Sequence, residues 1–418
     1  MHSENKKLLG NIFFLQILQI TNYILPLITI PYLVRVLGPE KFGLIAFAQA
    51  IIQFFVIMTD YGFNYSATRK ISVLRGDKDG VARVVNAVFS VKTIFLCTGF
   101  IVLMILVWSI PQLRGYELLY LFTFGTVLGS VLFPVWLFQG MEQMKYITYS
   151  NILAKLIFTV AVFICVKKET DYLYVPVLTS AGAIIAGLYA IRIAWKKFGI
   201  LPRASSGRAM IAEIKEGWHV FVTVSLYALY TASIPVILGS LAGYNAVGFY
   251  SAGEKIVRAT QQMLNPVFQV FYPHVSKMAA DSRKKAIVFV RKIAGVVGLF
   301  TFILSCAILL AAPEICNVFL GSQFRGSISI LRILSFLVFV QGLSQVFLSQ
   351  IMLSFGDDRV VSLISVCGAG TCIISAFVLI PVLAGNGAAL AVLLPEIVIL
   401  TISARFVEQK YRFFTFKY

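Results

Sequence analysis

The sequence predicts an all-α integral membrane protein with about twelve transmembrane helices in two parallel six-helix lobes. Three observations predict this fold. Hydrophobic residues make up 59% of the 418 residues and charged residues only 13%, with a mean hydropathy of +0.87. Runs of about 20 apolar residues, each long enough to cross a bilayer as a helix, recur along the chain. A glycine-containing motif also occurs twice, about half a chain length apart.

The predicted spans follow one another with only short polar connections. A soluble domain would carry about one quarter charged residues, so the composition excludes that class. The spans are expected at residues 11–33, 43–60, 85–109, 117–138, 149–166, 172–194, 218–241, 246–274, 289–312, 326–353, 360–381 and 385–404. Prolines inside the spans, at Pro26, Pro31, Pro134, Pro235 and Asn265-Pro266, are expected either to break a helix beside a transport lumen or to form an ordinary kink.

The repeated motif indicates a duplication. Arg35–Gly43, at the first external turn, has a weaker counterpart at Gly243–Gly248, an offset of 205 residues (243 − 38). Gly182-Ala183 recurs as Gly387-Ala388 at the same offset. Six spans precede the central linker, so the second half enters the membrane from the same side as the first. We therefore expect a pseudo-two-fold axis along the membrane normal.

The polar linker also sets the predicted domain boundaries. We predict an N-terminal lobe over residues 1–195, a cytosolic linker over 196–217 and a C-terminal lobe over 218–418. No soluble domain or phosphate-binding loop interrupts either lobe. The sequence therefore leaves no place for an appended catalytic module.

The net charge of +18 reflects membrane topology rather than nucleic-acid binding. Basic residues gather in alternate connections, and the positive-inside rule then places both termini in the cytosol. Only three histidines occur, and the cysteines form no C-x-x-C pair. We therefore expect no metal site, disulfide or resident cofactor.

Charged residues inside the spans are the candidate functional groups, because a charge at the bilayer centre is costly. Arg258 and Glu396 lie nearest the middle of their predicted spans. Lys92 and Lys155 lie within about two turns of the cytosolic boundary, where a lysine can extend to water. Arg332 can do the same on the external side.

Two alternatives remain open for the deeper charges. Glu254, Lys255 and Arg258 form one cluster in which Glu254 and Arg258 either neutralise each other at i,i+4 or leave a net positive charge for a phosphate. Glu396 is either a protonatable coupling group or the partner of a cation.

One acid is expected at the cytosolic end of the second span. Asp60 is predicted to cap a helix or to pair with Arg69 or Lys70.

Three motifs together resemble the polysaccharide exporters of the multidrug/oligosaccharidyl-lipid/polysaccharide (MOP) superfamily, specifically its Wzx-type O-antigen flippases. Arg35–Gly43 resembles the first external turn of that family, Phe138–Glu142 the end of its fourth helix, and Phe249–Lys255 the start of its eighth. The resemblance spans essentially the whole chain.

The resemblance implies a MATE-like fold around a cationic cavity. It also implies a flippase of lipopolysaccharide biosynthesis that moves undecaprenyl-diphosphate-linked oligosaccharide from the cytosolic to the periplasmic leaflet of the bacterial inner membrane. H⁺ or Na⁺ coupling is expected by analogy. The expected partners are the substrate, the lipid bilayer, a polysaccharide polymerase and a chain-length regulator, with the protein itself monomeric.

Each part of that substrate needs a different surface. Lys92, Lys155, Lys255, Arg258 and Arg332 are the candidates for attracting the diphosphate. Glu254, Glu396 and Asp60 are the candidates for coupling or charge pairing. Trp136, Tyr227 and Tyr230 are aromatic candidates for stacking on sugars, with helix packing as the alternative.

Two other functions are weighed against the flippase. A cation-coupled exporter of small molecules or drugs from the same superfamily predicts a lumen with acids rather than surplus cations. A membrane glycosyltransferase or polymerase predicts a sizeable extramembrane domain or external loop, which the short connections do not provide.

Overall fold

The computed structural model describes the backbone of residues 2–200 and 203–415. Side chains in those ranges are described except at residues 2–24, 26, 27, 223, 224, 226–229 and 270. Leu201 and Pro202 of the predicted linker and the tail beyond Thr415 lie outside the described residues, as does the side chain of Tyr227. The described chain is helical almost throughout and contains no strand, which confirms the all-α prediction.

Contacts divide the chain into two units. The first unit contains the chain up to Leu37 and residues 45–232, and the second contains residues 38–44 and the chain from Ser233 onward. The predicted boundary lies earlier, in the linker 196–217, but helix α8 already begins inside that linker, at Gly207. The first part of α8 thus belongs to the first unit, and the first external turn belongs to the second.

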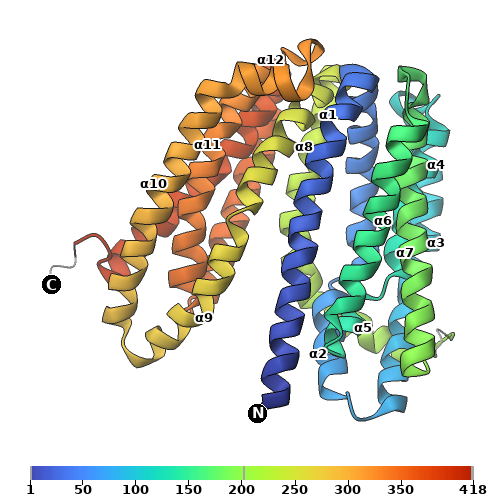
Figure 1. Ribbon diagram of the computed structural model, residues 1–418, viewed down its shortest axis with the longest axis vertical. Helices are drawn as coiled ribbons and strands as arrows, with labels where there is room; N and C mark the ends of the chain where they lie inside the picture. The colour runs from blue at the N-terminus through green and yellow to red at the C-terminus, as the bar shows by residue number, and fades with distance from the viewer. Residues whose placement is uncertain (1, 201–202, 416–418) are drawn as a thin grey trace. The chain divides into compact units, whose positions relative to one another are not determined.

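The first unit is a bundle of antiparallel helices (Figure 1). Its elements are α1 (His2–Asp60), α2 (Phe63–Val73), α3 (Lys78–Ser109), η1 (Pro111–Leu113), α4 (Glu117–Leu132), α5 (Val135–Gly140), α6 (Met144–Cys165), η2 (Glu169–Leu173) and α7 (Tyr174–Phe198). Helix α7 packs on both α4 and α6. Small residues permit the close approach of α4 and α7, because a Cβ on Gly129 would lie 2.5 Å from the Cβ of Ala183.

The second unit is also helical. Its elements are the rest of α8 (Gly207–Gln262), α9 (Asn265–Asp281), α10 (Arg283–Ile315), η3 (Cys316–Leu320), η4 (Ser322–Phe324), α11 (Ser327–Gln345), η5 (Val346–Leu353) and α12 (Asp358–Tyr411). Helix α11 lies between α10 and α12 and contacts both. The segments η3 and η5 have π-helical hydrogen bonding, and η5 continues α11 without a break.

The structure accounts for the number of spans. Nine helical segments of the described chain are long and apolar enough to cross a membrane. Three of them contain one residue with non-helical backbone, at Gly38, Gly243 and Ala384. Dividing these three segments at that residue turns nine spans into twelve, the number that the sequence predicts.

The predicted proline breaks have mixed outcomes. Pro134 separates α4 from α5, and Pro266 lies in the first turn of α9, after the end of α8. By contrast, α8 continues through Pro235, and α1 through Pro26 and Pro31, so these prolines do not end a helix. A proline interrupts a long membrane helix only where other groups satisfy the freed carbonyl.

The duplicated glycine motif takes the same backbone conformation twice. Gly38 has φ 67° and ψ 175°, and Gly243 has φ 81° and ψ 172°. Residues with side chains rarely adopt such positive φ values, so glycine is favoured at both turns. The sequence repeat therefore corresponds to a structural repeat.

The two copies also pack against each other within the second unit. A Cβ on Gly43 would lie 1.9 Å from the carbonyl oxygen of Tyr244, and a Cβ on Gly248 would lie 2.0 Å from that of Pro39. Each copy thus places a glycine against the backbone of the other. Phe42 and Phe249 complete the contact by packing edge-on against the buried ring of Phe324.

This close approach predicts that Gly43→Ala destabilises the protein. The added methyl group meets a backbone oxygen that cannot rotate away, so we expect a loss of about 1–3 kcal/mol, the usual cost of overpacking. Thermal unfolding of the detergent-solubilised protein, followed by the fraction that remains monodisperse, measures the loss. Gly76→Ala is the control, since a Cβ at Gly76 meets nothing within 4 Å. Equal melting temperatures for both variants would contradict the role of the contact.

Candidate functional site

The charged residues that the sequence singles out fall into separate groups. In the first unit, Asp60 and Lys92 come together, and Lys155 lies apart from them in a cavity. In the second unit, Glu254, Arg258 and Glu396 form one group. The remaining two are Lys255, which packs on an aromatic ring, and Arg332, which is exposed on α11 and joins no group.

The buried Lys92 forms an ion pair with Asp60, whose side chain is 33% exposed. The Lys92 side chain is only 1% exposed, and its Nζ donates to Asp60 Oδ1 at 2.8 Å and to the carbonyl of Ser130 at 3.2 Å. The expectation that Lys92 extends to the cytosolic boundary is therefore wrong. A lysine held this far from water needs an acid and a carbonyl to offset its lost hydration.

The predicted partners of Asp60 are also corrected. Lys70 binds Glu213 and Glu216 of α8, and Arg69 binds Glu216. Both cations lie on α2, beyond the end of α1, where they reach the start of α8 instead of Asp60. The pairing of Asp60 with Lys92 joins α1 to α3, across 32 residues of sequence.

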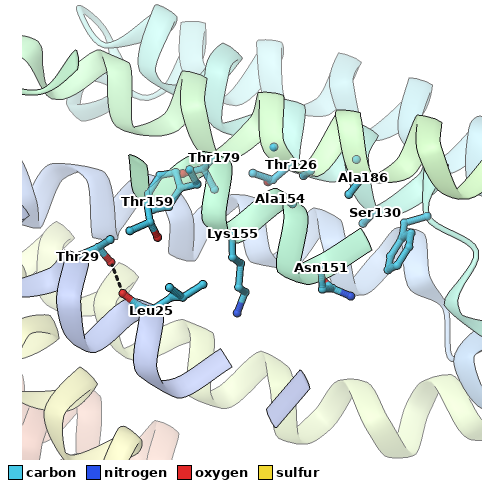
Figure 2. Close-up of a pocket in the computed structure, with 15 residues that line it drawn as sticks. Leu25, Thr29, Thr126, Ser130, Asn151, Ala154, Lys155, Thr159, Thr179 and Ala186 are labelled. Carbon is cyan, nitrogen blue, oxygen red and sulfur yellow. Dashed lines mark hydrogen bonds between the residues drawn. The ribbon is translucent and has the colours of Figure 1, made fainter. Parts of the chain in front are cut away.

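Lys155 lines a cavity of about 370 Å³ in the first unit (Figure 2). The lining comes from α1, α4, α6 and α7 and the residue after α4: Leu25, Thr29, Thr126, Gly129, Ser130, Phe133, Asn151, Ala154, Lys155, Phe158, Thr159, Thr179, Gly182, Ala183 and Ala186. Lys155 extends from α6 away from α4 and α7 (Figure 2).

Neutral polar groups accompany Lys155 around this cavity. The hydroxyls of Thr126, Ser130 and Thr179 donate to carbonyls of their own helices. The hydroxyl of Thr159 is buried without a hydrogen-bond partner among the described residues. One cation, several hydroxyls and the amide of Asn151 together form a surface able to bind an anion that also carries hydrogen-bonding groups.

The cluster in the second unit is an acid–base group rather than a purely cationic one. Arg258 donates from Nη2 and Nε to Glu254 Oε1, at 2.7 and 2.8 Å. Glu396 of α12 lies near enough to Arg258 to interact with it electrostatically. Arg258 thus interacts with two acids. Of the two alternatives for Glu254 and Arg258, the structure shows the one in which they neutralise each other.

Lys255 has a different environment from its neighbours. Its Nζ lies 4.9 Å from the centre of the Phe42 ring, a cation–π contact inside the second unit. Phe42 belongs to the first copy of the glycine motif. This lysine therefore links the duplicated turn to the helix that carries Glu254 and Arg258.

The two aromatic candidates with described side chains are buried. Trp136 is 1% exposed and packs edge-on against Phe89 in a core cluster, and Tyr230 is 8% exposed. Trp136 serves helix packing, the alternative to stacking on a sugar that the sequence left open. Sequence reasoning missed the polar lining of the Lys155 cavity, although Asn151 and Lys155 stand one helical turn apart on α6.

No group of three or more His, Cys, Asp or Glu within the described residues could hold a metal ion.

Comparisons with known proteins find one matching family and two relatives that share a name. Residues 8–279 match the profile of a family described as "Polysaccharide biosynthesis protein". The chain is 30% identical over 408 residues to the "Putative O-antigen transporter" of Escherichia coli (strain K12), covering 98% of both chains. It is 26% identical over 397 residues to a protein of the same name from Shigella dysenteriae, covering 93% of this chain and 97% of that one.

Two solved structures show the same fold at low sequence identity. A lipid II flippase, MurJ, in an inward closed conformation superposes with a TM-score of 0.75 at 13% identity, over 95% of this chain and 87% of that chain. An inward-facing multidrug resistance transporter of the MATE family, in the MOP superfamily, gives 0.70 at 16% identity over 92% and 94%. The predicted MOP fold is confirmed.

The buried pair predicts a stability effect that a double-mutant cycle can measure. Asp60→Asn leaves Lys92 charged, buried and without its acid, so we expect a loss of about 3 kcal/mol. Adding Lys92→Met removes the charge and should recover most of that loss. Thermal unfolding in detergent gives both values.

Arg83→Ala is the control for that cycle, because Arg83 and Asp77 form an exposed pair expected to contribute less than about 1 kcal/mol. If Asp60→Asn were no more destabilising than Arg83→Ala, the pair would not be structural.

Proposed function

Since the chain belongs to the polysaccharide biosynthesis protein family, we propose that it translocates a lipid-linked oligosaccharide across the bacterial inner membrane. The substrate proposed is an undecaprenyl-diphosphate-linked O-antigen repeat unit or a related surface polysaccharide precursor. It moves from the cytosolic to the periplasmic leaflet by alternating access. The observation that carries the proposal is the near full-length similarity to the E. coli O-antigen transporter.

The Lys155 cavity supports this substrate class. A diphosphate needs cationic and hydrogen-bonding groups at membrane depth, and the cavity offers one lysine among hydroxyls, including the Thr159 hydroxyl that no described residue satisfies. We propose Lys155 as a diphosphate contact, with Lys92 holding α1 to α3 rather than touching substrate. Transport of this kind requires no covalent step, so no catalytic residue is proposed.

The acid–base cluster supports a coupling role in the second unit. Arg258, held by Glu254, is the group of this cluster whose positive charge is proposed to attract a phosphate. Glu396 is then the proposed binding group for H⁺ or Na⁺. A bound ion neutralises the carboxylate and releases Arg258, and loss of the ion restores the attraction between them. Lys255 stays near this group and contributes positive charge, whereas the exposed Arg332 is proposed to meet anionic headgroups.

The same proposal extends to the orientation of the protein in the membrane, its partners and its oligomeric state. The basic residues of alternate connections support cytosolic termini. A polymerase and a chain-length regulator are proposed partners on the periplasmic side, where the translocated unit is used, and the transporter is proposed to act as a monomer.

One observation favours a second function, a cation-coupled exporter of small molecules. Such an exporter needs acids at membrane depth, and Glu254 and Glu396 both lie beside Arg258. The arginine neutralises part of that negative charge, which makes the cluster a weaker site for an organic cation. The two functions differ in what accumulates when the protein is missing.

Deletion and complementation test the proposed function directly. Loss of the gene should abolish the surface polysaccharide and leave lipid-linked repeat units on the cytosolic leaflet. Both defects should disappear when the gene is restored. Normal polysaccharide in a deletion strain that has no second exporter would rule out the flippase and leave the drug exporter to be tested.

Site variants test the assignment of the charges. Arg258→Ala and Lys155→Ala should each lower polysaccharide export about tenfold or more at equal expression, since each removes a charge-assisted contact. Lys167→Ala is the control: this lysine is exposed and bonds the Phe163 carbonyl one turn away. Export equal to the control in both variants would refute these contacts.

A further inference from the structure

A second cavity, of about 390 Å³, lies in the second unit and is lined by neutral polar side chains. Helix α9 contributes Asn265, Phe268, Gln269 and Tyr272, and the end of α11 with η5 contributes Gln345, Ser349, Gln350 and Leu353. Six of these eight residues are polar and none is charged. The volume falls within the range of about 300–1,000 Å³ that is usual for small-molecule sites.

The backbone around this cavity is irregular on both sides. Helix α9 begins after a break, with Pro266 in its first turn, and η5 is a π-helical segment. Within a membrane, departures from α-helix persist where they line a cavity, and π-helical segments are frequent at functional sites. The two irregular segments are joined by Gln350, whose Nε2 donates to the carbonyl of Phe268 at 3.2 Å.

Gln350 also has a buried hydrogen-bond acceptor without a donor. The residue is 0% exposed, and its Oε1 has no hydrogen-bond partner among the described residues. Its Nε2 makes a second bond, to Ser349 Oγ at 3.0 Å, so the amide orientation is fixed by the donor side. A buried acceptor without a donor is costly, so this amide would gain from a hydrogen-bond donor that reached it from the adjoining cavity.

The chemistry of the lining selects the kind of ligand. Each amide offers a donor and an acceptor, as sugar hydroxyls do, so amides and sugars can bond in both directions. The half-exposed Tyr272 adds an aromatic face with a polar tip. With no cation in the lining the cavity does not suit a diphosphate, and with no acid it does not suit an organic cation.

The position of the cavity along the chain fits the place where a glycan would first meet the protein. α9 and η5 run into connections that the positive-inside rule assigns to the cytosol, since Lys277 lies near the end of α9 and Lys284 and Lys285 lie at the start of α10. A lipid-linked glycan is exposed to the cytosol before translocation.

We infer that the amide-lined cavity formed by α9, the end of α11 and η5 binds the sugar portion of the lipid-linked substrate on the cytosolic side. The inference rests on the proposed function and adds to it a glycan subsite, made of Asn265, Gln269, Gln345 and Gln350, that is separate from the Lys155 cavity.

Binding to the full-length protein in nanodiscs tests the inference with three ligands. These are synthetic undecaprenyl diphosphate, the lipid-linked oligosaccharide extracted from source cells in which this gene is deleted, and the oligosaccharide released from that lipid. The wild-type protein should bind the glycosylated lipid about tenfold more tightly than the bare lipid, and the free oligosaccharide more weakly than either.

The variant Gln269→Ala/Gln345→Ala separates the contribution of the sugar to binding from that of the lipid diphosphate. Both side chains are exposed, so the fold should tolerate the change. It should bind the glycosylated lipid no better than the bare lipid, with affinity for the bare lipid unchanged. Gln409→Ala, at an exposed position near the end of α12, is the matched control and should behave as wild type.

Three results would overturn the inference. The first is wild-type affinity of the double variant for the glycosylated lipid. The second is equal wild-type affinity for the bare and glycosylated lipids, which would leave the flippase proposal standing. The third is free oligosaccharide binding as tightly as the lipid-linked form, which would assign the cavity to a soluble sugar. If the wild-type protein bound neither lipid, the proposed function would fail together with the inference.

Discussion

The cost of placing charge in a hydrocarbon medium governs this molecule. Lys92, which is buried, has Asp60 and the Ser130 carbonyl beside it, and these groups offset its lost hydration. Arg258 has Glu254 beside it. Because part of this positive charge is neutralised, a count of basic residues along the spans overstates the positive charge available to substrate. The neutralising acids are Glu254, one turn from Arg258 on the same helix, and Asp60, on a different helix from Lys92.

Close backbone approach is the second constraint on the fold. The reciprocal contacts of Gly43 with Tyr244 and of Gly248 with Pro39 leave no space for a side chain at either glycine. A duplicated motif that packs against its own copy must keep glycine in both copies. The motif is therefore structural, and its functional value is indirect: it positions the stretch of α8 that carries Glu254, Lys255 and Arg258.

The sequence was sufficient to predict what depends on local composition and periodicity. It predicts the helical class, the twelve spans, the glycine turns and the breaks at Pro134 and Pro266, because each depends on residues close together in the chain. It does not predict that Lys92 pairs with Asp60, or that Lys70 pairs with Glu213, because both depend on which helices pack together. The charged residues stood out in apolar spans, whereas the neutral amides Gln345 and Gln350 did not. A partial signal exists, since Gln345 and Ser349 stand one helical turn apart in an otherwise apolar segment and Gln350 follows directly.

Two chemically different cavities support one function for the whole chain. The first unit offers a lysine among hydroxyls, and the second offers amides without charge. A diphosphate-linked glycan has one part suited to each.

The central claim is that the protein itself moves such a lipid between leaflets. Its most direct test is reconstitution into liposomes that contain the extracted lipid-linked oligosaccharide, with a lectin added outside to count exposed glycans. Protein-dependent exchange of glycans between the lectin-accessible and protected leaflets is the predicted result, and a distribution identical to that of protein-free liposomes would contradict the account.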